Sequence, residues 1–487
     1  MTSKIKFQFL ILFLIAFSIN AQEKAVPVFK DGEAQIVEAF NDPEKWIRTD
    51  LWVETTFDSD GDGKLDRMHV DVTRPAQTET EGLKLPIVYE SSPYYAGTAG
   101  DAPGLFWEVK HEIGEKEKPR THVEVQRRGL SDGTPTVGGD NESLAPKAVI
   151  DWLNGRAKGF TSREGTETVT AFWSTGKVGM TGTSYNGTIP LAAATTGVES
   201  LEAIIPVSPN TSYYHYYRSN GLVRSPGGYL GEDIDVLYDF IHSLLMSHGF
   251  NDWNVMPEHS YRIYKKASEM GLPTQIYYHQ NGHGGPPPMI LMNRWFTRYL
   301  HGVENNVEND AKAWIVREDD QNDAPTAYKN YPNPDAKPVT FYLEAGAPKA
   351  GNLSTDKSIS KGKETLVDNY SFSSEMLAQA AYTNHRLLYV TPVLKEDLHI
   401  SGLATITVKA SSSKAAVNLS VYLVSLPWDS GRRSKITDNI ITRGWADLQN
   451  YKSISKGEAL KPGKFYEMTF DLQPDDQIIK KGQQIGL

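Results

Sequence analysis

Hydrophobic and polar positions alternate in two stretches near the beginning of the chain, Leu51–Phe57 and Met68–Val72. Alternation with a period of two residues predicts strands that bury one face. The segment between them, Asp58-Ser-Asp-Gly-Asp-Gly63, is rich in turn-forming residues. We therefore expect a β-hairpin in this part of the chain.

In the middle of the chain, short apolar strands alternate with segments of helical periodicity. This order predicts a parallel sheet with helices on both faces, which is an α/β fold. Residues 210–243 interrupt the order, since they are aromatic, glycine-rich and irregular before an expected helix. The predicted strands are Leu85–Tyr89, Thr121–Val125, Lys177–Thr181, Ala203–Val207, Leu244–Ser247 and Thr274–His279, and the predicted helices are Ala148–Leu153, Ile189–Thr196, Pro257–Met270 and Met289–Leu300.

After residue 335 the pattern becomes strand-like throughout. No long helical segment separates the alternating stretches, so residues 336–487 predict a β-sandwich that follows an α/β domain at 22–335. The chain stops within a predicted strand, so the sandwich could lack its last strand. The alternating stretches are Val339–Leu343, Ala404–Val408, Val417–Val424 and Tyr466–Leu472.

The N-terminal 21 residues have the pattern of a signal peptide. Lys4 and Lys6 precede an apolar run over Phe9–Phe17, and Ala21 is a small residue suited to cleavage before Gln22. A membrane anchor is the alternative, but the run is too short to cross a bilayer comfortably. We expect a secreted or periplasmic protein that has no membrane segment after cleavage.

Composition narrows the class of protein further. A length of 487 residues suggests two or three domains. The chain has no cysteine, which excludes disulfides, a thiol nucleophile and thiolate metal sites. Its net charge of −10 argues against nucleic acid and anionic membranes as partners. No motif indicates a metal or organic cofactor, and a homo-oligomer is compatible with the sequence.

The strongest chemical motif is the stretch that leads from Lys177 through Gly182-Thr-Ser184 to Gly187. A strand, a tight turn with small residues and a helix form the arrangement that exposes a nucleophilic serine. The backbone N–H of Tyr185 would then face a developing oxyanion at the helix N-terminus. The second glycine comes one position later than is usual, with Asn186 in the usual place. The alternative is an ordinary turn serine.

A nucleophilic serine requires a base and an acid that orients it. In α/β hydrolases these follow in the order serine, acid, histidine, each at the C-terminal end of a strand. Asp252 follows the strand at 244–247, and His283 follows the strand at 274–279. His248 and His279 are competing histidines, but one precedes the acid and the other lies within a strand.

Several motifs together resemble the Xaa-Pro dipeptidyl-peptidase family. This resemblance implies an α/β-hydrolase domain, a helical cap before the acid-bearing strand and a C-terminal jelly-roll sandwich. It also implies removal of a dipeptide from peptides that have a free N-terminus and proline at the second position. The motifs are Gly182-Thr-Ser-Tyr-Asn-Gly187, Ala193–Glu199, Val149–Gly155, Tyr217–Gly228 and His248-Gly-Phe-Asn-Asp-Trp-Asn-Val255.

The same resemblance assigns roles to individual residues. Ser184, Asp252 and His283 match the catalytic triad, and Tyr94 in Ser92-Pro-Tyr94 matches the second oxyanion donor. Glu232 in Gly231-Glu-Asp233 matches the carboxylate that binds the substrate's amine. A core tyrosine and a helix-start carboxylate are the alternatives for these last two. The remaining substrate-binding candidates, which could equally be core residues, are Tyr213, Tyr216, Trp253, Asn254 and Val255.

The chain departs from the family's pattern between Glu232 and Asp252, where the stretch is much shorter than in relatives. A shortened cap would leave a more open site and a less firmly held amine anchor. An esterase or α-amino-acid ester hydrolase of the same fold therefore stays an alternative, as does a non-catalytic binding protein.

The hairpin turn at Asp58, Asp60 and Asp62 resembles the first half of a calcium loop. The twelfth position counted from Asp58 is His69, where such loops have glutamate, and strands flank the turn in place of helices. A polar turn without an ion is the favoured interpretation.

Overall fold

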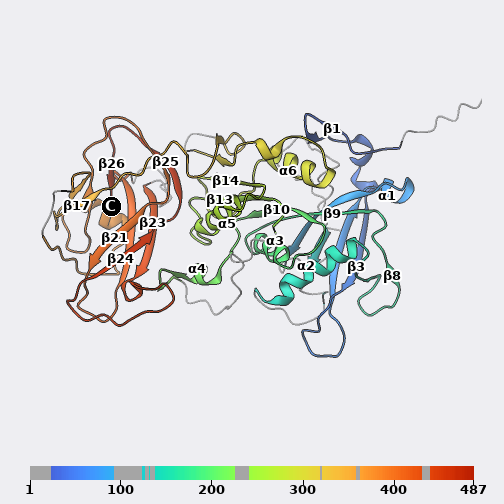
Figure 1. The fold of residues 1–487 in the computed structure, drawn as a ribbon, viewed down its shortest axis with the longest axis horizontal. Helices are drawn as coiled ribbons and strands as arrows, with labels where there is room; N and C mark the ends of the chain where they lie inside the picture. The colour runs from blue at the N-terminus through green and yellow to red at the C-terminus, as the bar shows by residue number, and fades with distance from the viewer. Residues whose placement is uncertain are drawn as a thin grey trace, which may run out of the picture.

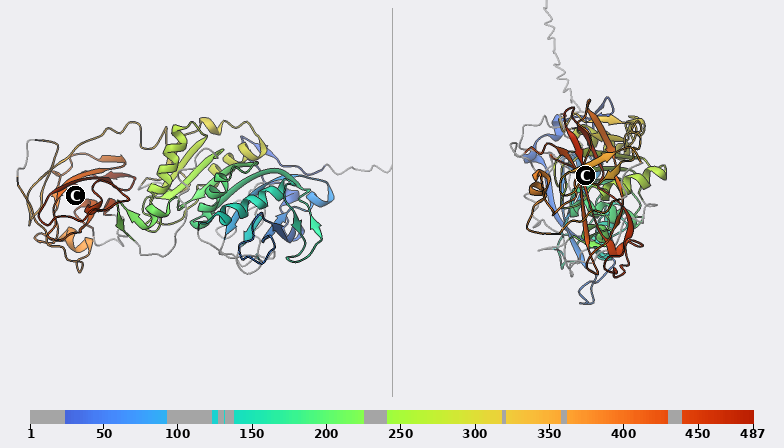
Figure 2. Two further views of the ribbon diagram at one scale, coloured as in Figure 1. Left: turned by 60° about the horizontal axis from the view of Figure 1, so that its bottom comes forward. Right: turned by 90° about the vertical axis from the view of Figure 1, so that its left-hand side faces the viewer.

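The computed structural model describes residues 24–92, 123–126, 131, 138–224, 241–317, 321–357, 362–429 and 439–487. The molecule is elongated, with an α/β part coloured blue to yellow and a β-rich part coloured orange to red at one end (Figures 1 and 2). The predicted signal peptide lies outside the described residues.

A sheet of 12 strands organises the α/β part, in the order β16-β15-β14-β13-β10-β9-β5-β6-β4-β3-β7-β8. The neighbours from β15 to β6 are all parallel, and the strands beyond them at both edges pair antiparallel. The predicted hairpin is confirmed as β3 and β4, with Leu51 opposite Val70. The strands are β3 (Ile47–Glu54), β4 (Arg67–Arg74), β5 (Leu85–Ser92), β6 (Val123–Gln126), β7 (Gly159–Phe160), β8 (Thr168–Val169), β9 (Ser174–Thr183), β10 (Leu201–Val207), β13 (Leu244–Gly249), β14 (Thr274–His279), β15 (Ala313–Ile315) and β16 (Thr326–Tyr328).

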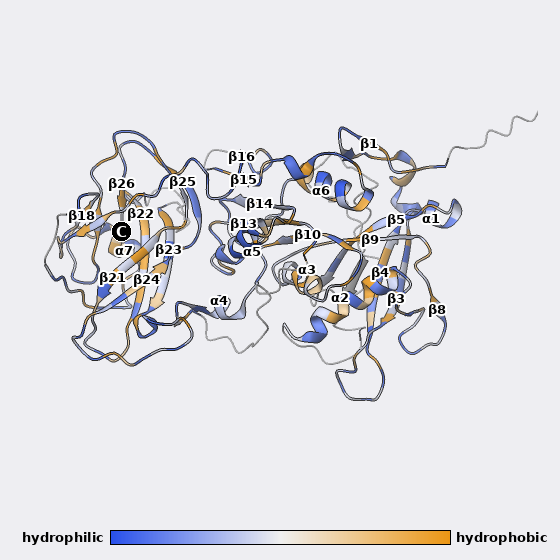
Figure 3. Cartoon of the chain, viewed as in Figure 1, coloured by the Kyte–Doolittle hydropathy of each residue, from blue (hydrophilic) through white to orange (hydrophobic). Residues whose placement is uncertain are grey.

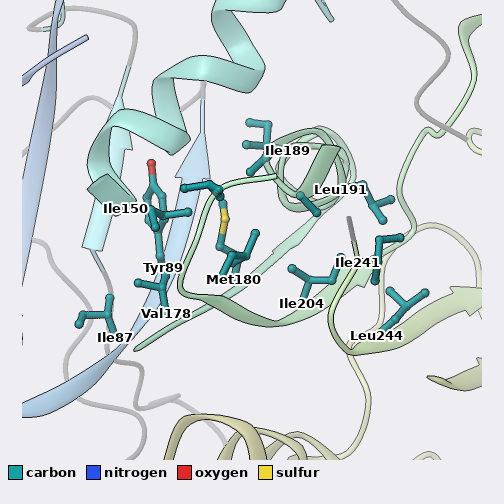
Figure 4. Close-up of a cluster of buried hydrophobic side chains, with 14 of the residues drawn as sticks. Ile87, Tyr89, Ile150, Val178, Met180, Ile189, Leu191, Ile204, Ile241 and Leu244 are labelled. Atoms are coloured by element: carbon teal, nitrogen blue, oxygen red, sulfur yellow. The ribbon is translucent and has the colours of Figure 1, made fainter. Parts of the chain in front are cut away.

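Helices cover both faces of this sheet, as the alternation of strands and helices predicts. Successive strand residues point to opposite faces, so Ile204 packs with α2, α3 and α5 while Ala203 and Ile205 pack with α6. Figure 4 shows the first of these cores, where Met180 and Leu244 of the sheet lie near α3. The helices are α1 (Gln77–Thr80), α2 (Asp140–Leu153), α3 (Tyr185–Thr195), α4 (Tyr213–Tyr217), α5 (Glu258–Glu269), α6 (Met289–His301) and α7 (Ser374–Gln379), with short 3-10 turns η1 (Glu38–Phe40), η2 (Pro43–Lys45), η6 (Val307–Asn309) and η8 (Leu448–Asn450).

The C-terminal part consists mainly of strands. It contains a sheet in the order β17-β18-β19-β26-β22-β23 and two strand pairs, β20-β25 and β21-β24. Apolar side chains of these strands form two hydrophobic cores. Apolar segments (orange) run through these strands and through the parallel sheet in Figure 3. The strands are β17 (Tyr342–Glu344), β18 (Gly351–Ser354), β19 (Tyr389–Val390), β20 (Leu398–Gly402), β21 (Thr405–Ala410), β22 (Asn418–Leu426), β23 (Ile440–Asp447), β24 (Tyr466–Asp471), β25 (Asp475–Ile479) and β26 (Gln484–Gly486), and two small pairs elsewhere are β1 (Phe29–Lys30) with β2 (Glu33–Ala34) and β11 (Arg218–Ser219) with β12 (Leu222–Val223).

Several predicted boundaries differ from the structure, and the largest shift is at α2, which begins at Asp140 where the sequence predicted Ala148. The strand expected from Val339 begins at Tyr342, and the Val339 side chain is 63% exposed, so its apolar character does not mark a buried face. The helix expected from Ile189 begins at Tyr185, immediately after Ser184. Among the described residues, no helix has the length and apolarity needed to cross a membrane.

Candidate active site

Ser184 lies on the turn between β9 and α3, at the C-terminal edge of the parallel sheet. Its backbone has φ 64° and ψ −124°, a conformation that non-glycine residues rarely adopt. The strained turn is held because the Ser184 N–H donates to Val207 O at 2.8 Å, while Ser184 O accepts from the N–H groups of Gly187 and Thr188. Such a turn presents a serine side chain at the edge of the sheet.

The two glycines of the motif are both required by close contacts. A Cβ added to Gly182 would lie 2.4 Å from Asn186 O, and one added to Gly187 would lie 2.7 Å from Val207 O and 2.8 Å from Gly182 O. The crowded backbone therefore needs its second glycine at position 187. Asn186 fits in the usual glycine position, where its Nδ2 donates to Glu90 Oε1 at 3.2 Å.

Asp252 follows β13 in a loop that we define as the acid loop, residues 249–256. Its side chain is fully buried. Oδ1 accepts from the backbone N–H groups of Asn254 and Val255 at 2.9 and 3.0 Å, and Oδ2 lies 2.7 Å from His283 Nδ1. Two backbone donors thus orient the carboxylate, and its other oxygen faces the histidine.

The Asp252 carboxyl has a lowered pKa, although burial alone would raise it. Hydrogen bonds from His248 and His283, and the attraction of both rings, outweigh the burial. The carboxylate therefore stays ionised at neutral pH. An ionised acid at His283 Nδ1 favours the tautomer whose Nε2 can accept a proton.

His283 follows β14, and its loop packs against the turn that carries Ser184. A Cβ placed on the neighbouring Gly284 would contact Thr183 Cγ2 at 3.6 Å. The Ser208 hydroxyl, at the end of β10, accepts from Gly284 N–H at 3.2 Å. The loops that follow β9, β10 and β14 are therefore adjacent, and the His283 side chain is 28% exposed among them.

The two competing histidines hold the loops in place. His248 is fully buried, with Nδ1 2.6 Å from Ser260 Oγ and Nε2 2.9 Å from Val255 O, and it lies 3.3 Å from Asp252 Oδ2. His279 Nε2 donates to Gly284 O at 2.8 Å, and burial lowers the pKa of its ring. Both rings face fixed partners, whereas His283 reaches the partly exposed edge.

Comparison with known proteins agrees with these motifs. The model of the X-Pro dipeptidyl-peptidase (S15 family) matches residues 60–244, and that of the X-Pro dipeptidyl-peptidase C-terminal non-catalytic domain matches residues 305–487. A protein of Rhodopirellula baltica that is provisionally named Xaa-Pro dipeptidyl-peptidase is 53% identical, with 98% of this chain and 89% of the relative covered. The chain belongs to the X-Pro dipeptidyl-peptidase family.

Solved structures support the fold at much lower sequence identity. An aminopeptidase from a marine sediment archaeon, Thaumarchaeota archaeon, has a TM-score of 0.63 at 14% identity, and covers 93% of this chain and 90% of its own. An α-amino acid ester hydrolase has a TM-score of 0.61 at 15% identity, over 97% of this chain and 91% of its own. This family member therefore has an α/β-hydrolase domain followed by a C-terminal β domain.

Three of the substrate-binding candidates lie in the acid loop. Trp253 is 37% exposed and Asn254 is exposed, whereas Val255 is 3% exposed and therefore packs as a core residue. The Tyr216 hydroxyl donates to Asn254 Oδ1 at 3.0 Å, which joins α4 to this loop. Burial raises the pKa of Tyr216, and the nearby Asp252 raises it further.

Tyr213 and Tyr185 line a small cavity behind the turn of Ser184. Its volume is about 20 Å³, which is room for roughly one water molecule, so it is too small for a proline ring. The Tyr185 hydroxyl accepts from Gly138 N–H at 2.8 Å. As the first residue of α3, Tyr185 places its own N–H at the positive end of the helix.

Two predicted site residues, Tyr94 and Glu232, lie outside the described residues. The same holds for residues 225–240, which are part of the expected cap region at 210–243. Their roles stay predictions.

Two groups in the described part of the chain could provide metal ligands: Asp50 with His69 and Asp71, and Asp58 with Asp60 and Asp66. The second group takes Asp66 in place of the predicted Asp62. The Asp58 carboxylate accepts from the N–H groups of Gly61 and Gly63, and Asp62 accepts from Lys64 N–H, as expected of a polar turn. Both groups lie on or beside β3 and β4, whereas the triad candidates follow β9, β13 and β14.

Sequence reasoning missed Arg443, which reaches the acid loop from the C-terminal domain. Its Nη1 donates to Phe250 O at 3.0 Å, and its Nη2 donates to Asp252 O. An arginine within a strand carries no local signal of such a contact.

Proposed function

We propose that this protein is a serine peptidase that releases Xaa-Pro dipeptides from the N-termini of peptides. The main support is the hydrogen bond of 2.7 Å between buried Asp252 and His283, beside the strained turn of Ser184. Membership of the X-Pro dipeptidyl-peptidase family supports the substrate class.

In the proposed first step, Ser184 Oγ attacks the carbonyl carbon of the proline residue while His283 Nε2 takes the hydroxyl proton. The Tyr185 N–H and the Tyr94 hydroxyl stabilise the oxyanion. His283 then passes the proton to the departing amine, and the peptide C–N bond breaks. A water molecule, activated by the same histidine, hydrolyses the resulting ester and releases the dipeptide. Water is the only co-reactant, and no metal or organic cofactor takes part.

Specificity is proposed to come from two ends of the dipeptide. Glu232 binds the free ammonium group, and Tyr216 and Trp253 form rigid walls beside the proline ring, with Asn254 next to them. Val255, which is buried, and Tyr213, which lines the small cavity, support these walls from behind. The hydrogen bond between Tyr216 and Asn254 supports a site that includes both α4 and the acid loop. Binding at both ends would place the scissile bond two residues from the N-terminus.

A fluorophosphonate probe and Ala-Pro-anilide test the proposal together. The wild-type protein should be labelled at Ser184 and should hydrolyse the anilide. Ser184→Ala should lose labelling completely and lose turnover by roughly 10⁶-fold, because no other group supplies the nucleophile. Unchanged labelling of Ser184→Ala would exclude Ser184, and an inactive, unlabelled wild-type protein would indicate a non-catalytic binding protein.

A second candidate is an esterase of the same fold. The alignment with the Rhodopirellula relative extends over 556 positions, more than the 487 residues of this chain, so the relative has stretches without a counterpart here. A more open site would favour small esters over peptides. Comparing Ala-Pro-anilide with an aryl ester separates the two functions, since an esterase prefers the ester and ignores the free amine.

We also propose that the protein is exported and cleaved before Gln22, because residues 1–21 have the charge and apolar pattern of a signal peptide. N-terminal sequencing of the exported protein should begin at Gln22. A mature protein that begins at Met1 would contradict export by this route.

A further inference from the structure

The acid loop is held by the C-terminal domain as well as by its own sheet. Arg443 projects from β23, more than 180 residues along the chain, and is 2% exposed. Its guanidinium group donates to Phe250 O and to Asp252 O, and Nη2 also lies 3.6 Å from Met256 Sδ. One side chain thus contacts the loop on both sides of the acid.

The guanidinium group also lies over the ring of Trp253, 4.3 Å from its centroid. Trp253 in turn contacts Tyr422 and Trp445 of the C-terminal domain, with ring centroids 6.4 and 5.9 Å apart. The ring therefore contacts three side chains of that domain, while 37% of the residue stays exposed. Cation and aromatic contacts fix the position of the residue that follows Asp252.

Arg443 is charged despite its burial. Burial lowers the pKa of its guanidinium to about 10, and the nearby Asp475 and Asp252 carboxylates oppose that shift. A cation persists at neutral pH, where it faces two carbonyl oxygens of the acid loop. Without it, both oxygens would be buried with a donor missing, and the loop could relax toward other partners.

We infer that Arg443 is a positioning residue for the catalytic acid, so that the C-terminal domain completes the geometry of the triad. The inference rests on the proposed function, because it needs Asp252 to orient His283 during acylation of Ser184. Arginine suits this task since its planar fork can donate to carbonyls two residues apart, whereas lysine offers one ammonium group. The domain is non-catalytic in the sense that Arg443 does not contact the reacting atoms.

The test compares rates of phosphonylation at Ser184 after correction for the folded fraction. Arg443→Met removes the donors and keeps much of the volume, and should slow labelling about tenfold to a hundredfold, because a displaced acid misorients the base. Arg443→Lys keeps the charge and one donor group, and should give an intermediate rate. In Arg443→Ala, added ethylguanidinium should restore part of the rate, while ethylammonium should restore less.

Tyr331→Phe is the matched control. The Tyr331 hydroxyl donates to Asp475 O at 2.8 Å, so this variant also loses one buried hydrogen bond between the domains but leaves Asp252 untouched. Its labelling rate should stay within about twofold of wild type. Melting temperatures of all variants separate lost stability from lost geometry.

If folded Arg443→Met is labelled at the wild-type rate, the inference is wrong. The inference is also wrong if the labelling rate of Tyr331→Phe falls as much as that of Arg443→Met. If Arg443→Met does not fold, Arg443→Lys decides, and a wild-type rate there would show that the fork is not needed. A wild-type protein that is not labelled at Ser184 would instead overturn the proposed function.

Discussion

Two aspartate–histidine pairs in the described residues have nearly the same separation and exposure. Asp252 and His283 are 2.7 Å apart, with side-chain exposures of 0% and 28%, and Asp476 and His399 are also 2.7 Å apart, with exposures of 0% and 29%. Their surroundings differ. The first pair lies beside the strained turn of Ser184, whereas the second receives the Tyr328 hydroxyl on Asp476 Oδ1 at 3.0 Å.

The comparison shows that a buried acid and a partly exposed histidine do not by themselves form a catalytic site. The histidine at 283 follows a parallel strand, so the sheet brings it to the edge where β9 ends in a serine and α3 begins. His399 lies within β20, which pairs antiparallel with β25, and its acid joins strands at the junction of the two domains. The two pairs also differ in the ring nitrogen that meets the acid, which is Nδ1 in His283 and Nε2 in His399.

Among the changes that test the comparison between the two pairs, Asp252→Asn should have the largest effect. The new amide would still accept from Asn254 N–H, but its NH₂ would face His283 Nδ1 and favour the tautomer that cannot accept the serine proton. We expect turnover of Ala-Pro-anilide to fall about 10⁴-fold. Steady-state rates measure the loss. The control is Asp476→Asn at the second pair, which should leave the rate within about twofold of wild type.

Equal losses in these two variants would break the distinction between the pairs. They would indicate that both acids act on activity through the stability of the domain junction. Unfolding curves in urea, recorded for both variants, would then show matched losses of stability.

A smaller effect should follow from Gly187→Ala. Its Cβ would lie 2.7 Å from Val207 O, so the turn of Ser184 must shift, at a cost of about 1–3 kcal/mol in the free energy of unfolding. Labelling by the probe should also slow, by about a hundredfold, because the nucleophile moves. Urea unfolding and labelling rates measure the two effects.

Gly282→Ala is the control on the histidine side of the comparison. A Cβ there meets Asn251 O at 3.7 Å, an ordinary contact, although the residue directly precedes His283. It should keep wild-type stability and labelling. If Gly282→Ala instead lowers stability and the labelling rate more than Gly187→Ala does, the position of the His283 loop is more critical for activity than the turn of Ser184.

The smallest effect on activity should come from a change at a third acid, Glu232. Asp252 and Asp476 each pair with a histidine, whereas we propose that Glu232 binds the ammonium group of the substrate. A charge-assisted hydrogen bond contributes about 1.5–3 kcal/mol, so Glu232→Gln should lower kcat/KM for Ala-Pro-anilide roughly tenfold to a hundredfold. An N-acetylated substrate or a simple aryl ester has no ammonium and should be unaffected. Equal losses for both substrates would make Glu232 structural, and indifference of the wild type to the free amine would favour an esterase.

Much of the fold could be predicted from periodicity, because the pattern records which side of each element is buried. The alternation of strands and helices predicted the parallel sheet, and its two faces are indeed covered by different helices. The short strands β7, β8, β15, β16, β18 and β19 were missed, since two to four residues are too few to show a period. The longer strands β20, β23 and β25 were missed as well, and β23 shows no alternation because its first five residues are all buried. At Val339 the prediction placed a strand residue where there is none, because this apolar side chain is exposed and so does not mark a buried face.

The features of the candidate site likewise fall into those that local sequence predicts and those that depend on tertiary contacts. The sequence by itself determined the turn of Ser184, because a strand, two glycines and a helix within eleven residues leave the backbone few alternatives, and it determined the order of acid and base along the sheet. Only the tertiary structure decided which histidine meets Asp252 with an exposed edge, why the second glycine stands at 187, and that Arg443 contacts the acid loop. Those outcomes depend on contacts between residues far apart in the chain, and no local pattern encodes such distances.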